Sequence, residues 1–248
     1  MRSTPRTRSQ KSACPDLQMA PTHKRCRTVA PTTVQKARVA SYLLRMRDGD
    51  RSTHKPDVQL IPHFQQSLRK FDESLPLDGC KTLYEVICAY GVARTFKGST
   101  SDVPAHLSKW AVAMSRLQKS WPRMCGYPSV DEIVREVEGL CDVFQESWGS
   151  RNLSAASKVW VCLGVPTPIY DTLARLALFG HMRPATYSEY CDAFFARYEN
   201  ERLAYEAAAT EQSTEVERDQ LGIPWIAMRS FDEALLREAE AMQKKVRK

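Results

Sequence analysis

Apolar residues recur at helical spacing over almost the whole chain from about residue 34, and this pattern constrains the fold more than any other feature. Side chains three or four positions apart share one face of an α-helix, so each run predicts a helix that buries that face. Strand-like alternation is essentially absent, and no repeat occurs at the periods typical of solenoids. We therefore predict an all-α fold. The runs that carry this prediction cover residues 34–44, 64–71, 83–90, 107–117, 133–144, 154–163, 173–177, 187–198 and 231–242.

Several helix boundaries carry their own signals. Ser129 is followed three residues later by Glu132, and this capping-box pattern predicts a strong helix that ends near Gly149. Asp171 follows a Pro-containing turn and is a preferred N-cap residue, so the next helix is expected to begin there. Gly180 and the proline that follows it indicate the end of that helix.

Two further segments are expected to interrupt the helices. Trp121-Pro122 is predicted to close the helix before it, because proline lacks a backbone N–H and clashes with the preceding turn. Residues 206–222 are polar and acid-rich, and we expect a fraying helix end and a loop there.

The ends of the chain differ in composition from the rest. Residues 1–31 are rich in Pro, Ser, Thr and Arg and hold seven Lys or Arg against one Asp, which predicts a disordered basic tail before one all-α domain over 32–248. The last five residues add four positive charges, and the whole chain has a formal net charge of +7. Basic ends on a near-neutral body suit contact with a polyanion, and they are equally typical of solvated termini.

Composition and motifs exclude several classes of protein. The eight cysteines are scattered, with no C-x-x-C pair and no histidine at zinc spacing, so we expect free thiols in a reducing cytoplasm, no metal and no cofactor. No apolar run approaches the roughly 20 residues of a membrane helix, so no membrane partner is expected. The chain also lacks the G-x-S-x-G elbow, the H-E-x-x-H pattern and the zinc-deaminase signature.

Residues 154–171 hold the candidate chemistry of the chain. Lys158 lies in the first turn of a predicted helix, 13 residues before Asp171. A desolvated lysine amine is a nucleophile, and a carboxylate can stabilise a positive charge that develops during a reaction. The ordinary alternative is a solvated surface lysine followed by an aspartate that only caps its helix.

This segment resembles the helix-hairpin-helix DNA glycosylases. Ala156-Ser157-Lys158-Val159-Trp160-Val161-Cys162 is similar to that family's G-x-G-T-K-V-A-D-C-I pattern, and Pro168-Ile169-Tyr170-Asp171 is similar to its V-P-V-D-x-H turn. The resemblance covers about 130–182, with the helical hairpin at about 131–163 and the catalytic-aspartate turn at 164–180. The chain departs from the pattern in having one glycine, Gly149, in the hairpin and a short spacing between lysine and aspartate.

The resemblance implies a helical DNA-glycosylase-like fold and the excision of a modified or damaged base, which leaves an abasic site. Asp171 would support cleavage of the glycosidic bond. Lys158 would be either a Schiff-base nucleophile with strand nicking or a positively charged residue of a monofunctional enzyme. The hairpin would contact DNA through Gly149, Ser150, Arg151, Asn152, Ser154 and Ser157, and the extruded base would stack on Tyr170 and Trp160.

The expected partner is double-stranded DNA, bound by a monomer. Residues 229–236, Arg-Ser-Phe-Asp-Glu-Ala-Leu-Leu, also resemble a terminal-helix pattern of prokaryotic relatives encoded near phage-defence genes. That likeness extends the expected substrate to phage DNA with a hypermodified base such as glucosylated hydroxymethylcytosine. Two alternatives stay open, a non-catalytic helical DNA-binding module and a protein-interaction subunit of a defence system.

Overall fold

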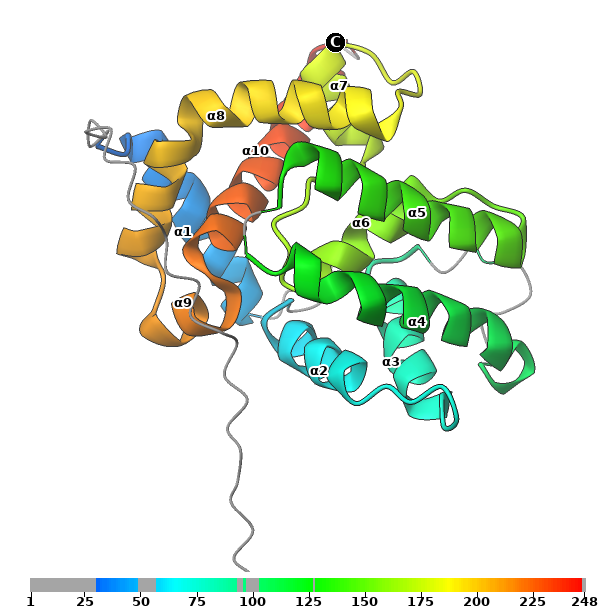
Figure 1. Ribbon diagram of the computed structural model, residues 1–248. Helices are drawn as coiled ribbons and strands as arrows, with labels where there is room; N and C mark the ends of the chain where they lie inside the picture. The colour runs from blue at the N-terminus through cyan, green and yellow to red at the C-terminus, as the bar shows by residue number, and fades with distance from the viewer. Residues whose placement is uncertain (1–29, 49–56, 93–95, 97–102, 127, 247–248) are drawn as a thin grey trace, which may run out of the picture.

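A computed structural model describes residues 30–48, 57–92, 96, 103–126 and 128–246 of the chain (Figure 1). Within these ranges the regular elements are all helical, which confirms the all-α prediction. Nearly all of the predicted tail over 1–31 lies outside the described residues. The α-helices are α1 (Thr33–Asp48), α2 (Asp57–Arg69), α3 (Leu77–Ala89), α4 (Leu107–Met124), α5 (Val130–Trp148), α6 (Leu153–Cys162), α7 (Thr172–Phe179), α8 (Tyr187–Gln212), α9 (Glu215–Leu221) and α10 (Ile223–Val246), and a short 3-10 turn (Pro104–His106) precedes α4.

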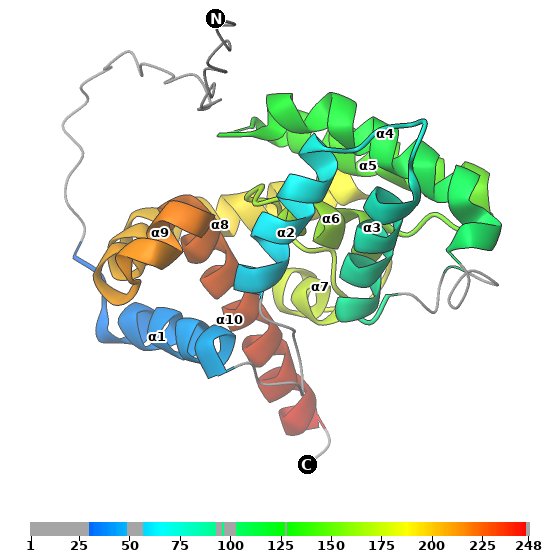
Figure 2. The ribbon, with the colours of Figure 1, turned by 90° about the horizontal axis from the view of Figure 1, so that it is seen from below.

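The helices form two packed groups. Helices α2 to α6 pack on one another and make the central lobe. The terminal lobe consists of α1, α7, α8, α9 and α10, in which α1 packs against α8 and α10 (Figures 1 and 2). The lobes meet where α5 contacts α8 and where α2 contacts α9. One continuous core of buried apolar side chains runs through both lobes. The chain therefore leaves the terminal lobe after α1 and returns to it with α7.

The boundary signals around the central segment act as the sequence predicts. The Ser129 side chain accepts the Glu132 N–H, and Glu132 accepts the Ser129 N–H in return, which completes a capping box at the start of α5. Gly149 ends α5 in the left-handed conformation with φ of 69°, and Gly180 ends α7 in the same way. These local signals fix where α5 begins and where α5 and α7 end.

Two boundary predictions were wrong. Helix α4 continues through Pro122 to Met124; because Pro122 lies in its last turn, the missing N–H removes a single hydrogen bond and no later turn is disturbed. The segment 206–222 is helical, with α8 reaching Gln212 and α9 following after a two-residue break. The buried face of α8 there consists of Tyr205 and small alanines such as Ala208, which give a weak apolar signal.

Other features of the described part bear on the sequence predictions. None of its helices is both long and apolar enough to cross a membrane. Its six cysteines are all free thiols, and it contains no group of three His, Cys, Asp or Glu side chains arranged to hold a metal ion.

Candidate functional site at the junction of the two lobes

The loop between α6 and α7 is held rigidly, because its polar backbone groups find buried partners. The Tyr170 N–H donates to Ser157 Oγ at 3.1 Å. The end of the loop that follows α6 is also fixed, because two side chains from the central lobe donate hydrogen bonds to the Leu163 carbonyl. Tyrosine hydroxyls from α8 bind its other end: Tyr187 donates to the Pro168 carbonyl at 2.8 Å and Tyr190 to the Ile169 carbonyl at 2.6 Å. The loop therefore delivers Asp171 in one defined position.

Asp171 is the N-cap of α7, as the sequence predicts. Its Oδ1 accepts the N–H of Leu173 at 2.8 Å. Within the described residues, its second carboxylate oxygen has no hydrogen-bond partner. The side chain is half-buried, so that oxygen remains partly accessible. One carboxylate thus both caps the helix and offers a free acceptor beside the lobe junction.

Lys158 reaches the same place from α6 in the central lobe. Its side chain is half-buried, and its Nζ lies 5.9 Å from the centroid of the Tyr90 ring. No hydrogen bond or ion pair to the ammonium occurs among the described residues. Burial lowers the pKa of Lys158, and the nearby Asp171 carboxylate opposes part of this shift. The structure therefore brings together the two charged side chains that the sequence singled out.

A buried ion pair on α10 adjoins these two residues, and sequence reasoning missed it as part of a site. The Arg229 guanidinium donates to the carboxylate of Asp232, and the side chains are only 7% and 4% exposed. Burial raises the pKa of Asp232 to about 7, although Arg229 opposes the shift. Asp171 raises this pKa as well, and Lys158 lowers it, so the four groups form one electrostatic cluster. The available sequence signal was an i, i+3 pair of opposite charges beside the apolar Phe231.

The hairpin between α5 and α6 spreads its predicted DNA contacts over exposed and buried positions. Gly149 and Arg151 are exposed and Ser150 and Ser154 are half-exposed, and the Arg151 guanidinium lies 2.9 Å from Asp142 of α5. By contrast, Asn152 is buried as the N-cap of α6, where it accepts the N–H of Ala155.

Ser157 is fully buried, and its hydroxyl is engaged by the carbonyl of Ser154 and the N–H of Tyr170. Neither Asn152 nor Ser157 presents its polar atoms to a phosphate in this conformation. The structure shows that α5 is followed by α6, and both the helix-hairpin-helix element and its contact with DNA stay predictions.

The two predicted base-pocket residues differ in their surroundings. Trp160 is fully buried, and its indole N–H donates to the Glu136 carbonyl at 3.3 Å, so it has no open face on which a base can stack. Tyr170 is half-buried, with the Arg175 guanidinium 4.8 Å from its ring centroid and its hydroxyl bound to the Ala185 carbonyl. Of the two, only Tyr170 has accessible aromatic surface near Asp171.

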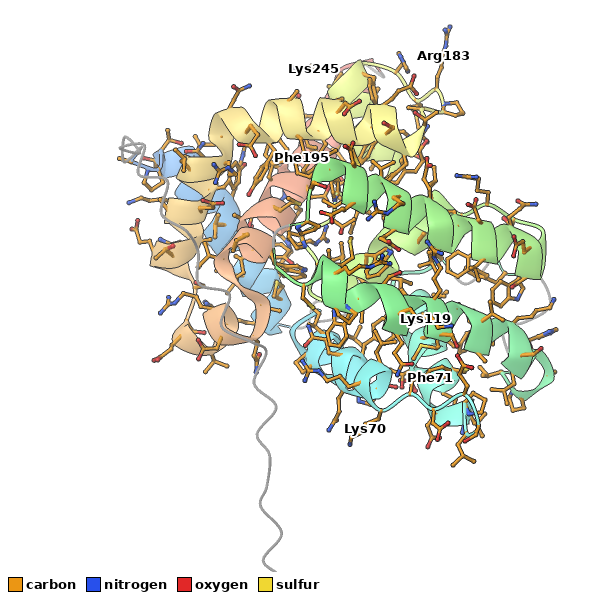
Figure 3. The ribbon with its side chains drawn as sticks, viewed as in Figure 1. Lys70, Phe71, Lys119, Arg183, Phe195 and Lys245 are labelled. Atoms are coloured by element: carbon orange, nitrogen blue, oxygen red, sulfur yellow. The ribbon has the colours of Figure 1, made fainter. Side chains whose placement is uncertain are left out.

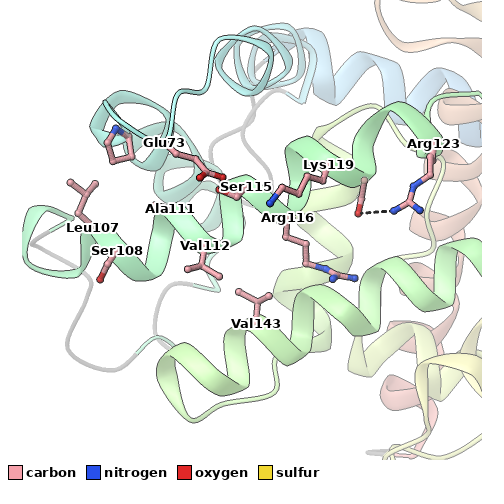
Figure 4. A pocket seen from close by; sticks show the side chains of 12 residues that line it. Glu73, Leu107, Ser108, Ala111, Val112, Ser115, Arg116, Lys119, Arg123 and Val143 are labelled. Carbon is pink, nitrogen blue, oxygen red and sulfur yellow. Dashed lines mark hydrogen bonds between the residues drawn. The ribbon is translucent and has the colours of Figure 1, made fainter.

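A large hollow lies elsewhere, on the central lobe. A cavity of about 1060 Å³ lies along α4 and faces α5, with Lys119, Arg116 and Val112 projecting toward it (Figure 4). Two smaller hollows lie between α5 and α8 and between α1 and α10. None of the three is lined by Lys158 or Asp171, so the candidate site in this conformation is a partly open cluster of charges. Arg183, in the loop after α7, points away from the body of the protein (Figure 3).

Comparisons with known proteins leave the family of this chain unassigned. No protein-family model, no curated protein and no solved structure matches the chain.

Proposed function

We propose that this protein is a DNA glycosylase that excises a modified or damaged base and leaves an abasic site. The observation that carries the proposal is the placement of Lys158 and Asp171 at the lobe junction: the half-buried ammonium has no hydrogen-bond partner among the described residues, and the Asp171 carboxylate is near enough to raise its pKa against the effect of burial. Groups whose pKa is shifted by burial and by a charged neighbour are common at catalytic sites, and Lys158 is such a group.

In the proposed reaction the C1′–N bond breaks and its electron pair leaves with the base, which gains a proton. The sugar then carries oxocarbenium-like positive charge, and the Asp171 carboxylate stabilises it electrostatically. Water attacks C1′ in a monofunctional enzyme and loses a proton. In a bifunctional enzyme the neutral amine of Lys158 attacks instead, which its lowered pKa favours.

Residues near Lys158 and Asp171 and in the connection between α5 and α6 have supporting roles in the proposal. Tyr170 provides aromatic surface next to the aspartate, and the exposed Gly149 and Arg151 with the half-exposed Ser150 are the proposed phosphate contacts. Arg151 is held by Asp142 in an exposed ion pair, which costs little to exchange for a phosphate. The proposed substrate is duplex DNA, and the antiphage resemblance adds duplexes with glucosylated hydroxymethylcytosine.

The test incubates the purified protein with plain duplex DNA, with duplexes that carry oxidised or alkylated bases, and with glucosylated phage DNA, and scores abasic sites by alkaline cleavage. Asp171→Asn is the decisive variant, because asparagine caps a helix about as well as aspartate while it removes the charge. We expect a loss of activity of about 100-fold or more. The matched control is Asp192→Asn, at an exposed acid on α8, with full activity expected.

Two outcomes would count against the assignment. Full activity of Asp171→Asn removes Asp171 from the chemistry. Salt-sensitive duplex binding without any abasic product, lost on hairpin substitution and kept in Asp171→Asn, supports a non-catalytic DNA-binding module instead. Borohydride trapping of the wild type, absent in Lys158→Arg, tests the Schiff-base route separately, since the guanidinium of arginine does not form the imine.

A further inference from the structure

A groove on the central lobe is separate from the Lys158–Asp171 site and is not used in the proposed reaction. It runs along one face of α4, from Leu107 to Arg123, and faces α5 (Figure 4). At a rise of about 1.5 Å per residue, this face of α4 is roughly 24 Å long. The cavity of about 1060 Å³ is at the upper end of the volumes of ligand sites, so the groove has room for a sizeable partner.

The half of the groove nearer the start of α4 is apolar. Leu107, Ala111 and Val112 line it from α4, and Val143 lines it from α5. Val112 is 51% exposed, and its side chain points across the groove toward Val143 (Figure 4). Apolar surface that is bordered by polar residues is typical of interaction sites.

The half nearer the end of α4 is cationic. Arg116, Lys119 and Arg123 line it at spacings of three and four residues, so they project from one face of the helix. Among the described residues that line the groove, Glu73 is the one acid, and its carboxylate accepts a hydrogen bond from the Ser115 hydroxyl at 2.6 Å. The lining therefore carries an excess of positive charge.

A buried carboxylate of α5 holds the two arginines of the groove in place. Glu136 is 3% exposed and accepts hydrogen bonds from Arg116 Nη2 at 3.3 Å and from Arg123 Nη2 at 3.4 Å. A third guanidinium, that of Arg135, donates to the same carboxylate at 3.5 Å. Three guanidinium groups thus share one carboxylate, and within the described part of the chain most of their N–H donors have no other acceptor.

The sequence of α5 makes room for Arg116. A Cβ at Gly139 would lie 1.7 Å from Nη2 of Arg116, so the guanidinium occupies space that any other residue would take. Glycine inside a helix is destabilising relative to alanine, so this position favours the placement of Arg116 over the stability of α5. Glu132, an acid within electrostatic reach of Arg123, is already used in the capping box of α5. The cationic half is therefore a fixed surface that can accept further negative charge.

We propose that this groove binds an acidic amphipathic helix of a partner protein. Apolar side chains of the partner cover Val112 and Val143, and its carboxylates bind the cationic half, in the helix-in-groove mode of recognition. An acidic partner complements the charge of the groove, whereas the basic residues 1–31 of this chain have the same sign of charge. A nucleic acid would use the cationic half and leave the apolar half uncovered. The interaction is independent of the proposed glycosylase activity.

The test measures the binding of fluorescent peptides to the full chain by fluorescence anisotropy. The probe is a peptide of about 16 residues, which spans the groove as a helix, with leucine on one face of its first half and glutamate on the same face of its second half. In one comparison peptide lysine replaces glutamate, and in another serine replaces leucine. We expect saturable binding of the probe, and binding about tenfold weaker for either comparison peptide.

Lys119→Glu and Val112→Gln are the decisive variants of the protein, because both side chains are exposed on α4 and neither substitution disturbs the core. Each should weaken the binding of the probe by about tenfold. The matched control is Lys81→Glu, the same charge reversal at an exposed lysine of α3 that does not line the groove, and its affinity should equal that of the wild type. Circular dichroism and the melting temperature check that each variant is folded.

Four results would each overturn the proposal. The first is the absence of saturable binding of the probe, and the second is an equal loss of affinity in Lys119→Glu and Lys81→Glu. The third is displacement of the probe by duplex DNA that binds Lys119→Glu less tightly than the wild type, which would make the groove a surface for phosphates. The fourth is a peptide-free dimer in sedimentation that Lys119→Glu dissociates, which would make a second copy of this chain the occupant.

Discussion

Ser157 offers the sharpest test of how the candidate site is built, because it was predicted to contact DNA and the structure gives it an internal role. Its fully buried hydroxyl donates to the Ser154 carbonyl at 3.2 Å and accepts the Tyr170 N–H at 3.1 Å. In Ser157→Ala the Tyr170 N–H loses its partner in the loop that leads to Asp171.

The expected cost can be worked out from these contacts. A polar group left unsatisfied on burial costs about 1–3 kcal/mol, and the higher helix propensity of alanine returns up to about 0.5 kcal/mol. We therefore expect the free energy of unfolding to fall by about 0.5–3 kcal/mol. For a chain of this size each kcal/mol corresponds to about 2–4 °C in melting temperature, so the melting temperature should fall by roughly 1–12 °C.

The assay is urea unfolding and thermal melting, in parallel with duplex-DNA affinity measured over a range of salt concentrations. Ser154→Ala is the matched control, because its half-exposed hydroxyl has no hydrogen bond among the described residues; its stability should stay within about 0.5 kcal/mol of the wild type. A Ser157→Ala variant of wild-type stability whose DNA affinity and salt dependence both fall would refute this reasoning. Such a result would return Ser157 to the DNA interface.

Two further predictions concern an ion pair between α1 and α9 and the glycine that ends α5. Arg47 of α1 binds Glu217 of α9 through two hydrogen bonds of 2.8 Å, and these bonds lower the pKa of the Glu217 carboxyl group. A carboxyl group whose pKa is lowered in the folded state contributes stability above the ordinary glutamate pKa, and this stability is lost as the pH falls through the folded-state pKa. In Glu217→Gln the free energy of unfolding should therefore depend less steeply on pH on the acid side. An unchanged slope of the free energy of unfolding against pH contradicts this. Gly149 has a φ of 69°, and a Cβ added there would meet no other atom. Gly149→Ala should therefore lower the free energy of unfolding by about 1–2 kcal/mol through backbone strain alone, as denaturant unfolding can measure. Gly149→Asn should lower it by less, because asparagine tolerates the left-handed conformation better than alanine.

Much of the fold follows from short-range signals in the sequence. The capping box at Ser129, the N-cap at Asp171 and the glycine ends of α5 and α7 depend on contacts within a few residues, so they are readable without a structure. The failures at 206–222 have a different cause. Charged residues on α8 form ion pairs such as that of Arg202 with Glu206, and the buried face there is built mainly from alanine, so composition alone resembles a loop.

The candidate site was predictable only in part. Lys158 and Asp171 were found because their residue types and order carry chemistry, and the structure places them within electrostatic reach. Arg229 and Asp232 were missed as site residues, because opposite charges three apart on a helix usually lie on its solvent face. Their burial depends on how α10 packs against α7 and α8, which is a long-range property.

The path of the chain between the two lobes has a consequence for synthesis on the ribosome. Within the lobe of α2 to α6 each helix packs against the next one along the chain, so this lobe can pack once α6 has emerged. Helix α1 is made long before α8 and α10 and yet packs against both of them. Its apolar side chains, Val39 and Leu43 among them, must wait exposed through the translation of well over a hundred residues. The nascent chain is therefore open to aggregation and chaperone capture at α1, and the charged cluster is completed only when α10 has been released.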